Sequence, residues 1–170
     1  FTAMKVMSTL YLTAFIVSKD QTLIAASLRL SILQFAGAAG TLLAGHLSDM
    51  IGKKATLLIS AVLSPLLIFL FTLASPGLQI PILIGLGFVL FAPGPVILAI
   101  IQDAGSDLPS FVNGLYMTIQ FMIRSTIVFI TGIAIDKAGF DITFIITIIA
   151  GTGTIPVILL YPYHHVFKSE

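Results

Sequence analysis

The sequence predicts an all-α membrane protein, in which six transmembrane helices form two inverted repeats of three helices. Three observations lead to this fold class. Of the 170 residues, 58% are hydrophobic and only 9% are charged, whereas a soluble domain carries about a quarter charged residues. The apolar residues gather in six stretches of membrane-spanning length. A short motif of glycine and aspartate occurs once in each half of the chain.

The composition also excludes several classes of function. A formal net charge of +1 offers no basic surface for nucleic acids, so we expect no nucleic-acid partner. The absence of cysteine removes disulfides and thiolate chemistry, and three histidines are too few to suggest a metal site. The sequence contains no G-x-S-x-G, H-E-x-x-H or Walker motif. We therefore expect no enzyme activity, no catalytic residue, no metal and no cofactor.

The six apolar stretches are separated by short polar segments. We expect the membrane spans at residues 1–17, 23–47, 55–74, 80–101, 111–135 and 142–161. Helices are favoured over strands because a transmembrane strand needs only about 10 residues with strict alternation. The chain already starts inside an apolar stretch, so we expect it to be a piece of a longer protein.

The orientation in the membrane follows from one pair of basic residues. Lys53 and Lys54 are the only adjacent basic residues in the chain, and cytoplasmic loops are enriched in lysine and arginine. Six spans then put the segment 103–107 and the C-terminus on the same side as this pair. We expect an integral protein of the plasma (inner) membrane with a cytoplasmic C-terminus.

The motif Gly-x-x-x-Asp-x-x-Gly occurs at residues 45–52 and again at residues 132–139. Both copies lie at the C-terminal end of a predicted span, the second and the fifth. Three spans per unit place the two copies on opposite sides of the membrane, and inverted repeats of this kind are typical of secondary transporters. Chance is the alternative, because glycine and aspartate are both common at helix ends.

The first copy resembles the loop motif of the major facilitator superfamily, a family of membrane transporters. The matching residues are Gly45, Leu47, Asp49, Gly52, Lys53 and Lys54, whereas Met50 replaces the usual basic residue. In that family the loop joins the second and third helices of each six-helix half on the cytoplasmic side. The resemblance implies that the chain is a C-terminal six-helix half, whose partner is an N-terminal half missing from this sequence.

A second resemblance concerns the region between the fourth and fifth predicted spans. The segments 91–96, 102–103, 108–109 and 113–114 resemble the corresponding region of C-terminal halves in the superfamily. The branch most similar is that of the fosmidomycin-resistance-like drug exporters. This resemblance implies that the transported solute is a drug or metabolite.

Arg124 is the most prominent candidate for binding a solute. It lies about 13 residues into the fifth predicted span, or roughly 20 Å by helical rise, and ionisable residues inside a membrane usually face the interior of the bundle. Asn113, Tyr116 and Gln120 share its helix face by their spacing. A guanidinium binds oxyanions bidentately, which favours an anionic or polar solute. A neutral solute rich in hydroxyl groups is the alternative.

The second predicted span carries two further candidates, Arg29 and Gln34. The resemblance implies that the second and fifth helices flank a central cavity, so that Arg29 could meet Arg124 there. Arg29 and Gln34 are separated by about 150° around the helix and are not expected to point inward together, and we rank Gln34 above Arg29. Instead of binding a solute, Arg29 could extend its side chain to the membrane interface, and Gln34 could form a hydrogen bond with a neighbouring helix. The sequence leaves the position of Lys5 open.

Two other features concern how the helices pack and move. The fourth predicted span is interrupted by Pro93, Gly94 and Pro95, because proline removes a helical hydrogen bond. The interruption indicates a gating helix, and a static kink is the alternative. Small residues on the second span predict close contact with another helix. They are Ala36, Gly37, Ala38, Ala39, Gly40, Ala44 and Gly45.

Taken together, these features predict a secondary active transporter of a small polar or anionic solute that works by alternating access. We expect the loop at Asp49 to stabilise one of its closed states. Its partners would be the small-molecule solute, the lipid bilayer and the missing half. Coupling to a proton gradient is implied by the resemblance alone. The alternative is a structural or channel-like six-span membrane subunit that does not transport.

Overall fold

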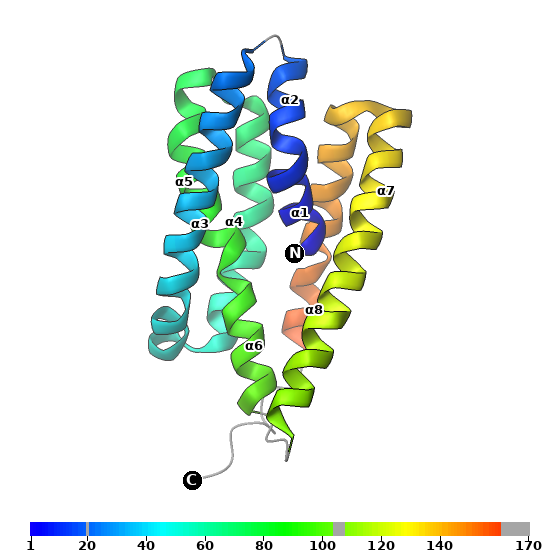
Figure 1. The fold of residues 1–170 in the computed structure, drawn as a ribbon. Coiled ribbons are helices and arrows are strands. Elements are labelled where there is room, and N and C mark those ends of the chain that lie inside the picture. The colour runs from blue at the N-terminus through cyan, green and yellow to red at the C-terminus, as the bar shows by residue number, and fades with distance from the viewer. Residues whose placement is uncertain (20, 104–107, 161–170) are drawn as a thin grey trace.

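The computed structural model describes residues 1–19, 21–103 and 108–160 (Figure 1), and the regular secondary structure of these residues is entirely helical. The predicted all-α class is therefore confirmed. The helices in chain order are α1 (Thr2–Val6), the π-helix η1 (Met7–Tyr11), α2 (Leu12–Ser18), α3 (Leu23–Ile51), α4 (Lys53–Leu73), α5 (Pro76–Phe91), α6 (Pro93–Asp103), α7 (Pro109–Thr152) and α8 (Thr154–Leu160).

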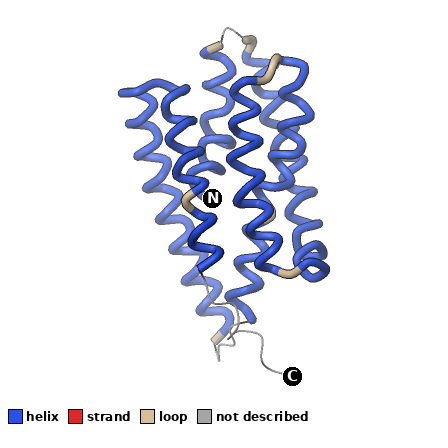
Figure 2. Tube along the Cα trace, turned by 180° about the vertical axis from the view of Figure 1, so that it is seen from behind, coloured by secondary structure: helices blue, strands red, loops and turns tan. Residues whose placement is uncertain are grey.

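Four helical segments in the described part of the chain are long and apolar enough to cross a membrane: Leu23–Ile51, Lys53–Leu73, Pro76–Asp103 and Pro109–Leu160. The segment Thr2–Ser18 is also an apolar helix, but it is shorter. Figures 1 and 2 show these segments lying side by side along one axis. Many large apolar side chains are exposed on the outside of the bundle, Leu42 at 82% and Phe35 at 79% among them. Such a surface is compatible with insertion into lipid.

The ends of the helices differ from the predicted spans at three places. α3 continues past residue 47 to Ile51, because the helix ends only at Gly52, whose φ is 90°. The fourth predicted span consists of α5 and α6, which meet at Ala92. The fifth and sixth predicted spans lie within one run of helix, Pro109–Leu160, in which Gly139 has a non-helical φ of 80°. Figure 1 shows the chain reversing its direction in this part of α7, where yellow passes into orange.

Glycine residues bring α3 and α5 into direct backbone contact. A Cβ atom at Gly40 would lie 2.6 Å from the backbone of Phe88, and one at Gly87 would lie 2.6 Å from the carbonyl oxygen of Leu33. No larger residue fits at these two positions without displacing the backbone. The predicted packing surface is thus present at Gly40 and at Gly37, which contacts the ring of Phe91.

Other members of the predicted packing surface lie elsewhere. Ala36 and Ala44 are buried, but Ala38 is exposed. A Cβ atom at Gly45 would meet nothing within 4 Å. The contact is therefore centred on the middle of α3 and does not extend to its C-terminal end.

The main apolar core joins the N-terminal segment to α4 and to the part of α7 that follows Gly139. Phe15 is its centre: its ring centroid lies 4.7 Å from that of Phe144 and 6.1 Å from that of Phe71. Met4 and Met7 are fully buried in the same cluster. This core holds together segments that are more than a hundred residues apart in the sequence.

Candidate functional site

The two copies of the glycine and aspartate motif end in the same backbone conformation. Gly52 has φ 90° and ψ 146°, and Gly139 has φ 80° and ψ 173°. They are the two glycines with positive φ in the described part of the chain. Residues with a side chain are almost excluded from this region of conformational space. The final glycine of each motif is therefore required by the turn that it forms.

The likeness between the two copies continues beyond the motif. Thr56 and Thr143 each lie four residues after the glycine, and each is only 2% exposed. The Thr56 hydroxyl donates to the carbonyl oxygen of Gly52 at 3.1 Å, and the Thr143 hydroxyl donates to that of Gly139 at 2.8 Å. The two threonines are not among the residues predicted from the sequence, although their equal spacing from the glycines is a signal that the sequence contains.

The charged residues at the first motif contact two other helices. The Lys53 ammonium forms an ion pair with the Asp103 carboxylate at the end of α6. The Lys54 ammonium lies 3.4 Å from the carbonyl oxygen of Leu159 in α8. Asp49 is exposed in the last turn of α3, and its carboxylate has no hydrogen-bond or ion-pair partner among the described residues. Among the described residues, the side-chain contacts of this motif with α6 and α8 are therefore made by Lys53 and Lys54 and not by Asp49.

The opposite end of the bundle has an ion pair of its own. The Lys19 ammonium, directly after α2, lies 2.9 Å from the carboxylate of Asp141. Asp141 follows the turn at Gly139, so this pair connects the end of the N-terminal segment to the second motif. Both side chains are largely exposed.

The predicted polar face of α7 is partly covered. Asn113, Tyr116 and Gln120 are half-buried, whereas Arg124 is exposed. Arg124 lies in an open depression with Phe121 and other residues of the same helix. The Oδ1 atom of Asn113 is buried without a hydrogen-bond partner among the described residues. The four residues therefore form a polar strip that ends in an accessible guanidinium.

Lys5 joins Arg124 at the middle of the bundle. The two residues are close enough for their positive charges to act on each other, and both lie roughly 20 Å from the end that carries Ser18 and Gly139, by helical rise. The Lys5 ammonium lies 4.2 Å from the centre of the Phe91 ring, a cation–π contact. Phe91 is the last residue of α5. Lys5 therefore adjoins the point where the α5–α6 helix is interrupted.

The described chain provides no carboxylate at this depth. Each aspartate that the structure describes lies close to a helix end or to the turn at Gly139; they are Asp49, Asp103, Asp136 and Asp141. Lys5 and Arg124 thus have no acidic partner within the described residues. The sequence alone does not predict whether Lys5 lies deep in the membrane or near its surface, because the depth of Lys5 depends on where the first helix ends.

The helix interruption occurs at the residue before the first proline. α5 ends at Phe91 and α6 begins at Pro93, while Ala92 keeps helical angles of φ −55° and ψ −38°. The change from one helix to the next is therefore small. A Cβ atom at Gly94 would meet nothing within 4 Å, and Pro95 is half-buried beside it. This geometry is compatible with both a gating helix and a static kink.

The two candidates on α3 have opposite surroundings. Arg29 is buried, and its guanidinium donates a hydrogen bond to the side-chain oxygen of Gln21. Gln34 is exposed. Arg29 therefore contacts the segment between α2 and α3, and its only hydrogen-bond partner in the described chain is Gln21.

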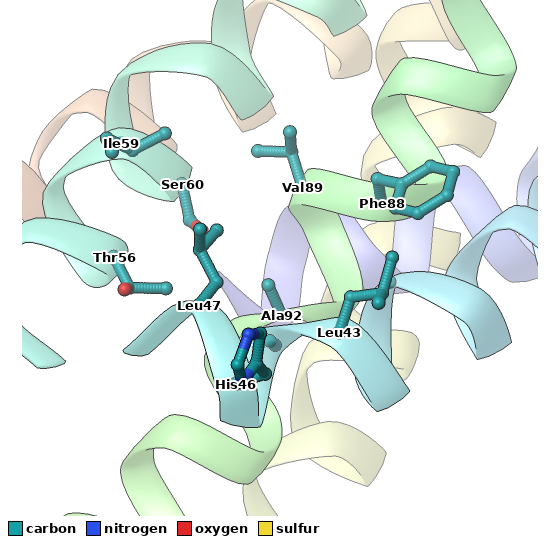
Figure 3. Close-up of a pocket in the computed structure, with 11 residues that line it drawn as sticks. Leu43, His46, Leu47, Thr56, Ile59, Ser60, Phe88, Val89 and Ala92 are labelled. Atoms are coloured by element: carbon teal, nitrogen blue, oxygen red, sulfur yellow. The ribbon is translucent and has the colours of Figure 1, made fainter. Parts of the chain in front are cut away.

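An apolar pocket of about 310 Å³ lies between α3, α4 and α5. Figure 3 shows side chains of the three helices around it. Leu43, Leu47 and Val89 supply apolar surface, and His46 lies beside them on α3. The lining suits a hydrocarbon group and lacks the charges that would bind an anion. None of the predicted solute-binding residues lines this pocket.

A second, polar pocket of about 240 Å³ lies at the end of the bundle where α2 leads into α3 and α4 leads into α5. Lys19, Gln21, Thr72 and Gln79 are its polar lining residues. Gln79 is only 7% exposed, and its side-chain nitrogen donates to the carbonyl oxygen of Ala74 at 3.3 Å. Its side-chain oxygen has no donor among the described residues.

Comparisons of the chain with models of protein families, with curated proteins and with solved structures find no match. The described residues also contain no group of three or more histidine, aspartate or glutamate side chains that could hold a metal ion. The chemistry of the chain is therefore inferred from its own residues and their geometry.

Proposed function

We propose that the chain is a six-helix half of a secondary active transporter, of the type of the major facilitator superfamily, and that it moves a small anionic solute by alternating access. The observation that carries this proposal is the pair of cations formed by Lys5 and Arg124. They lie near the middle of the bundle, without a carboxylate nearby in the described chain. Ionisable residues at such a depth are costly and are usually functional.

The length of the last helical run supports six membrane passes. A continuous helix over Pro109–Leu160 would be about 78 Å long, more than twice the hydrocarbon thickness of about 30 Å. The reversal at Gly139 divides this run into two passes. With the segment Thr2–Ser18 and the three other long helical segments, the proposed total is six.

The two glycine turns support an inverted repeat. The chain makes three of the proposed passes between Gly52 and Gly139, so the two turns belong to opposite ends of the bundle. In Figure 1 the cyan turn near residue 52 is at the lower end, and the reversal near residue 139 is at the upper end. The same backbone angles and the same threonine hydrogen bond at both turns favour a repeated unit over chance.

The polar residues around Arg124 favour an anion as the solute. A guanidinium binds a carboxylate or phosphate through two parallel hydrogen bonds, and a nearby ammonium adds a second positive charge. Asn113, Tyr116 and Gln120 could orient the solute by hydrogen bonds from the same helix. We propose that an N-terminal six-helix half covers the exposed Arg124 and completes the cavity. Any proton-coupling carboxylate would then belong to that half.

The proposed membrane topology follows from the lysine pair at residues 53 and 54. We propose that this end of the bundle is cytoplasmic in the plasma (inner) membrane. The predicted cytoplasmic C-terminus, residues 161–170, and most of the segment 103–107 lie outside the described residues. An exposed Asp49 is available to contact the other half in one closed state, which is the proposed role of this loop.

The proposal is tested by transport in proteoliposomes that contain the full natural polypeptide. Radiolabelled phosphate, citrate and lactate serve as anionic probes, and glucose serves as the neutral probe. We expect saturable, gradient-dependent flux of an anion that falls at least tenfold in Arg124→Ala and recovers in part in Arg124→Lys. Lys137→Ala, which removes an exposed positive charge beside the turn at Gly139, is the matched control.

The alternative function gives a different result. A structural or channel-like subunit shows no saturable flux for any probe at normal protein levels. Equal flux in the wild type and in Arg124→Ala would remove the solute-binding role of this residue. Asp49→Ala is expected to slow transport while the protein level remains unchanged.

A further inference from the structure

Arg29 is a buried cation with a neutral partner. The residue is 9% exposed, and its one hydrogen-bond partner among the described residues is the amide oxygen of Gln21. The Nε atom of Arg29 is buried and has no acceptor among the described residues. No described carboxylate forms an ion pair with it. A buried charge is costly unless it is paired and hydrogen-bonded, so this position is suited to an anion.

The polar pocket adjoins this arginine through Gln21, which lines the pocket and bonds Arg29. The pocket also contains an unsatisfied acceptor, the side-chain oxygen of the buried Gln79. A ligand that satisfies both orphaned groups must offer an anionic oxygen to Arg29 and a hydrogen-bond donor to Gln79. A water molecule occupies about 30 Å³ of liquid volume, so a cavity of about 240 Å³ holds a small organic ligand.

The backbone around the pocket adds to the positive potential. α3 begins at Leu23 and α5 begins at Pro76, and both helices start at this end of the bundle. Helix N-termini carry partial positive charge. Lys19 also lines the pocket, although Asp141 offsets its charge. The surroundings therefore favour an anion over a cation, and a hydroxyl group over an ammonium as the donor to Gln79.

We propose that this pocket is a binding site for a small hydroxycarboxylate. The ligand carboxylate replaces the Gln21 amide oxygen as the partner of Arg29, and the ligand hydroxyl donates to the side-chain oxygen of Gln79. Gln21 lies two residues before the first residue of α3. Its neutral amide bonds Arg29 in the absence of the ligand and is displaced when the ligand binds. The site is separate from the region of Lys5 and Arg124, with which it shares no residue, and it does not depend on transport.

The test is isothermal titration calorimetry of the full natural polypeptide in lipid nanodiscs. The probes are L-lactate, propionate, which has the same carboxylate but no hydroxyl, and inorganic phosphate. We expect lactate to bind more tightly than propionate by about tenfold, the usual scale for one hydrogen bond at a buried site. We expect Arg29→Gln to weaken both ligands at least tenfold, whereas Lys137→Ala, which removes an exposed positive charge on α7, leaves their binding unchanged.

Gln79→Leu is the sharper variant, because it removes the acceptor but keeps an apolar side chain of similar size. It is expected to reduce lactate binding to the level of propionate and to leave propionate binding unchanged. This result tests the proposal even if Arg29→Gln fails to fold. Gln21→Ala is expected to strengthen both ligands, since the competing amide oxygen is removed.

Three results would overturn the proposal. The first is the absence of lactate and propionate binding to the wild type. The second is lactate binding that is equally tight in Gln79→Leu. The third is phosphate binding that exceeds lactate binding, which would contradict the assignment to a hydroxycarboxylate.

Discussion

The turn at Gly52 and the turn at Gly139 have the same backbone but different charges. At both, a glycine with positive φ is followed four residues later by a buried threonine that bonds back to it. Two residues after the glycine, however, the first turn has Lys54 and the second has Asp141. The backbone of both reversals is therefore built on a glycine with positive φ, while the charged residues differ between the two ends of the bundle.

The largest expected effect comes from replacing the two glycines. Gly52→Val and Gly139→Val should each destabilise the protein by about 1–3 kcal/mol, because a β-branched residue is strained in this conformation. The loss is measured as the change in unfolding free energy in mixed detergent micelles. Gly45→Ala is the control: its Cβ atom meets nothing within 4 Å, so stability should stay equal or rise. Unequal losses at residues 52 and 139 would break the equivalence of the turns.

A smaller effect is expected from the threonines. Thr56→Val and Thr143→Val keep the size of the side chain but remove its hydrogen bond to the glycine carbonyl, so each should cost about 1 kcal/mol. Thr118→Val removes a bond of the same kind on an exposed face, where Thr118 donates to the Gly114 carbonyl oxygen at 2.9 Å. That control should change stability by less than about 0.5 kcal/mol. If only one of the two buried threonine substitutions lowers the unfolding free energy, the two turns are alike in their glycines but not in their threonines.

The smallest expected effect on stability concerns the two ion pairs, one at each end of the bundle. Lys19 and Asp141 have side chains that are 50% and 67% exposed, whereas the Lys53 side chain is only 15% exposed. Double-mutant cycles to alanine should therefore give a coupling of about 0.2–0.5 kcal/mol for Lys19 with Asp141 and about 1 kcal/mol for Lys53 with Asp103. Salt should weaken the exposed pair more. The reverse order of couplings would show that exposure does not govern these contacts.

Several features of the fold could be predicted from the sequence because they depend on local composition. Continuous apolarity predicts helices, and the structure confirms the all-α class. Pro93 predicts an interruption in the fourth apolar stretch, which occurs at Ala92. The final glycines of the two motifs mark the two reversals. The polar residues Ser48 and Asp49 predict an end of the second span at residue 47, which is too early, because the helix continues to Ile51.

Other features depend on contacts between distant segments and could not be predicted in this way. The π-helix Met7–Tyr11 ends at Tyr11, whose hydroxyl donates to the carbonyl oxygen of Val128 at 3.1 Å. Nothing in the local sequence signals the partner, which is more than a hundred residues away. The proximity of Lys5 to Arg124 likewise results from how distant segments pack.

The backbone contact between α3 and α5 has a mechanical consequence. Sliding α3 by one turn would bring Ala44 opposite Phe88 in place of Gly40, and the 2.6 Å spacing there admits no Cβ atom. A slide of one turn between these two helices is therefore opposed by a steric clash. A change of shape in the bundle would then have to be absorbed elsewhere, and the junction at Ala92, where proline interrupts the helical hydrogen bonds, is compatible with a pivot of α6.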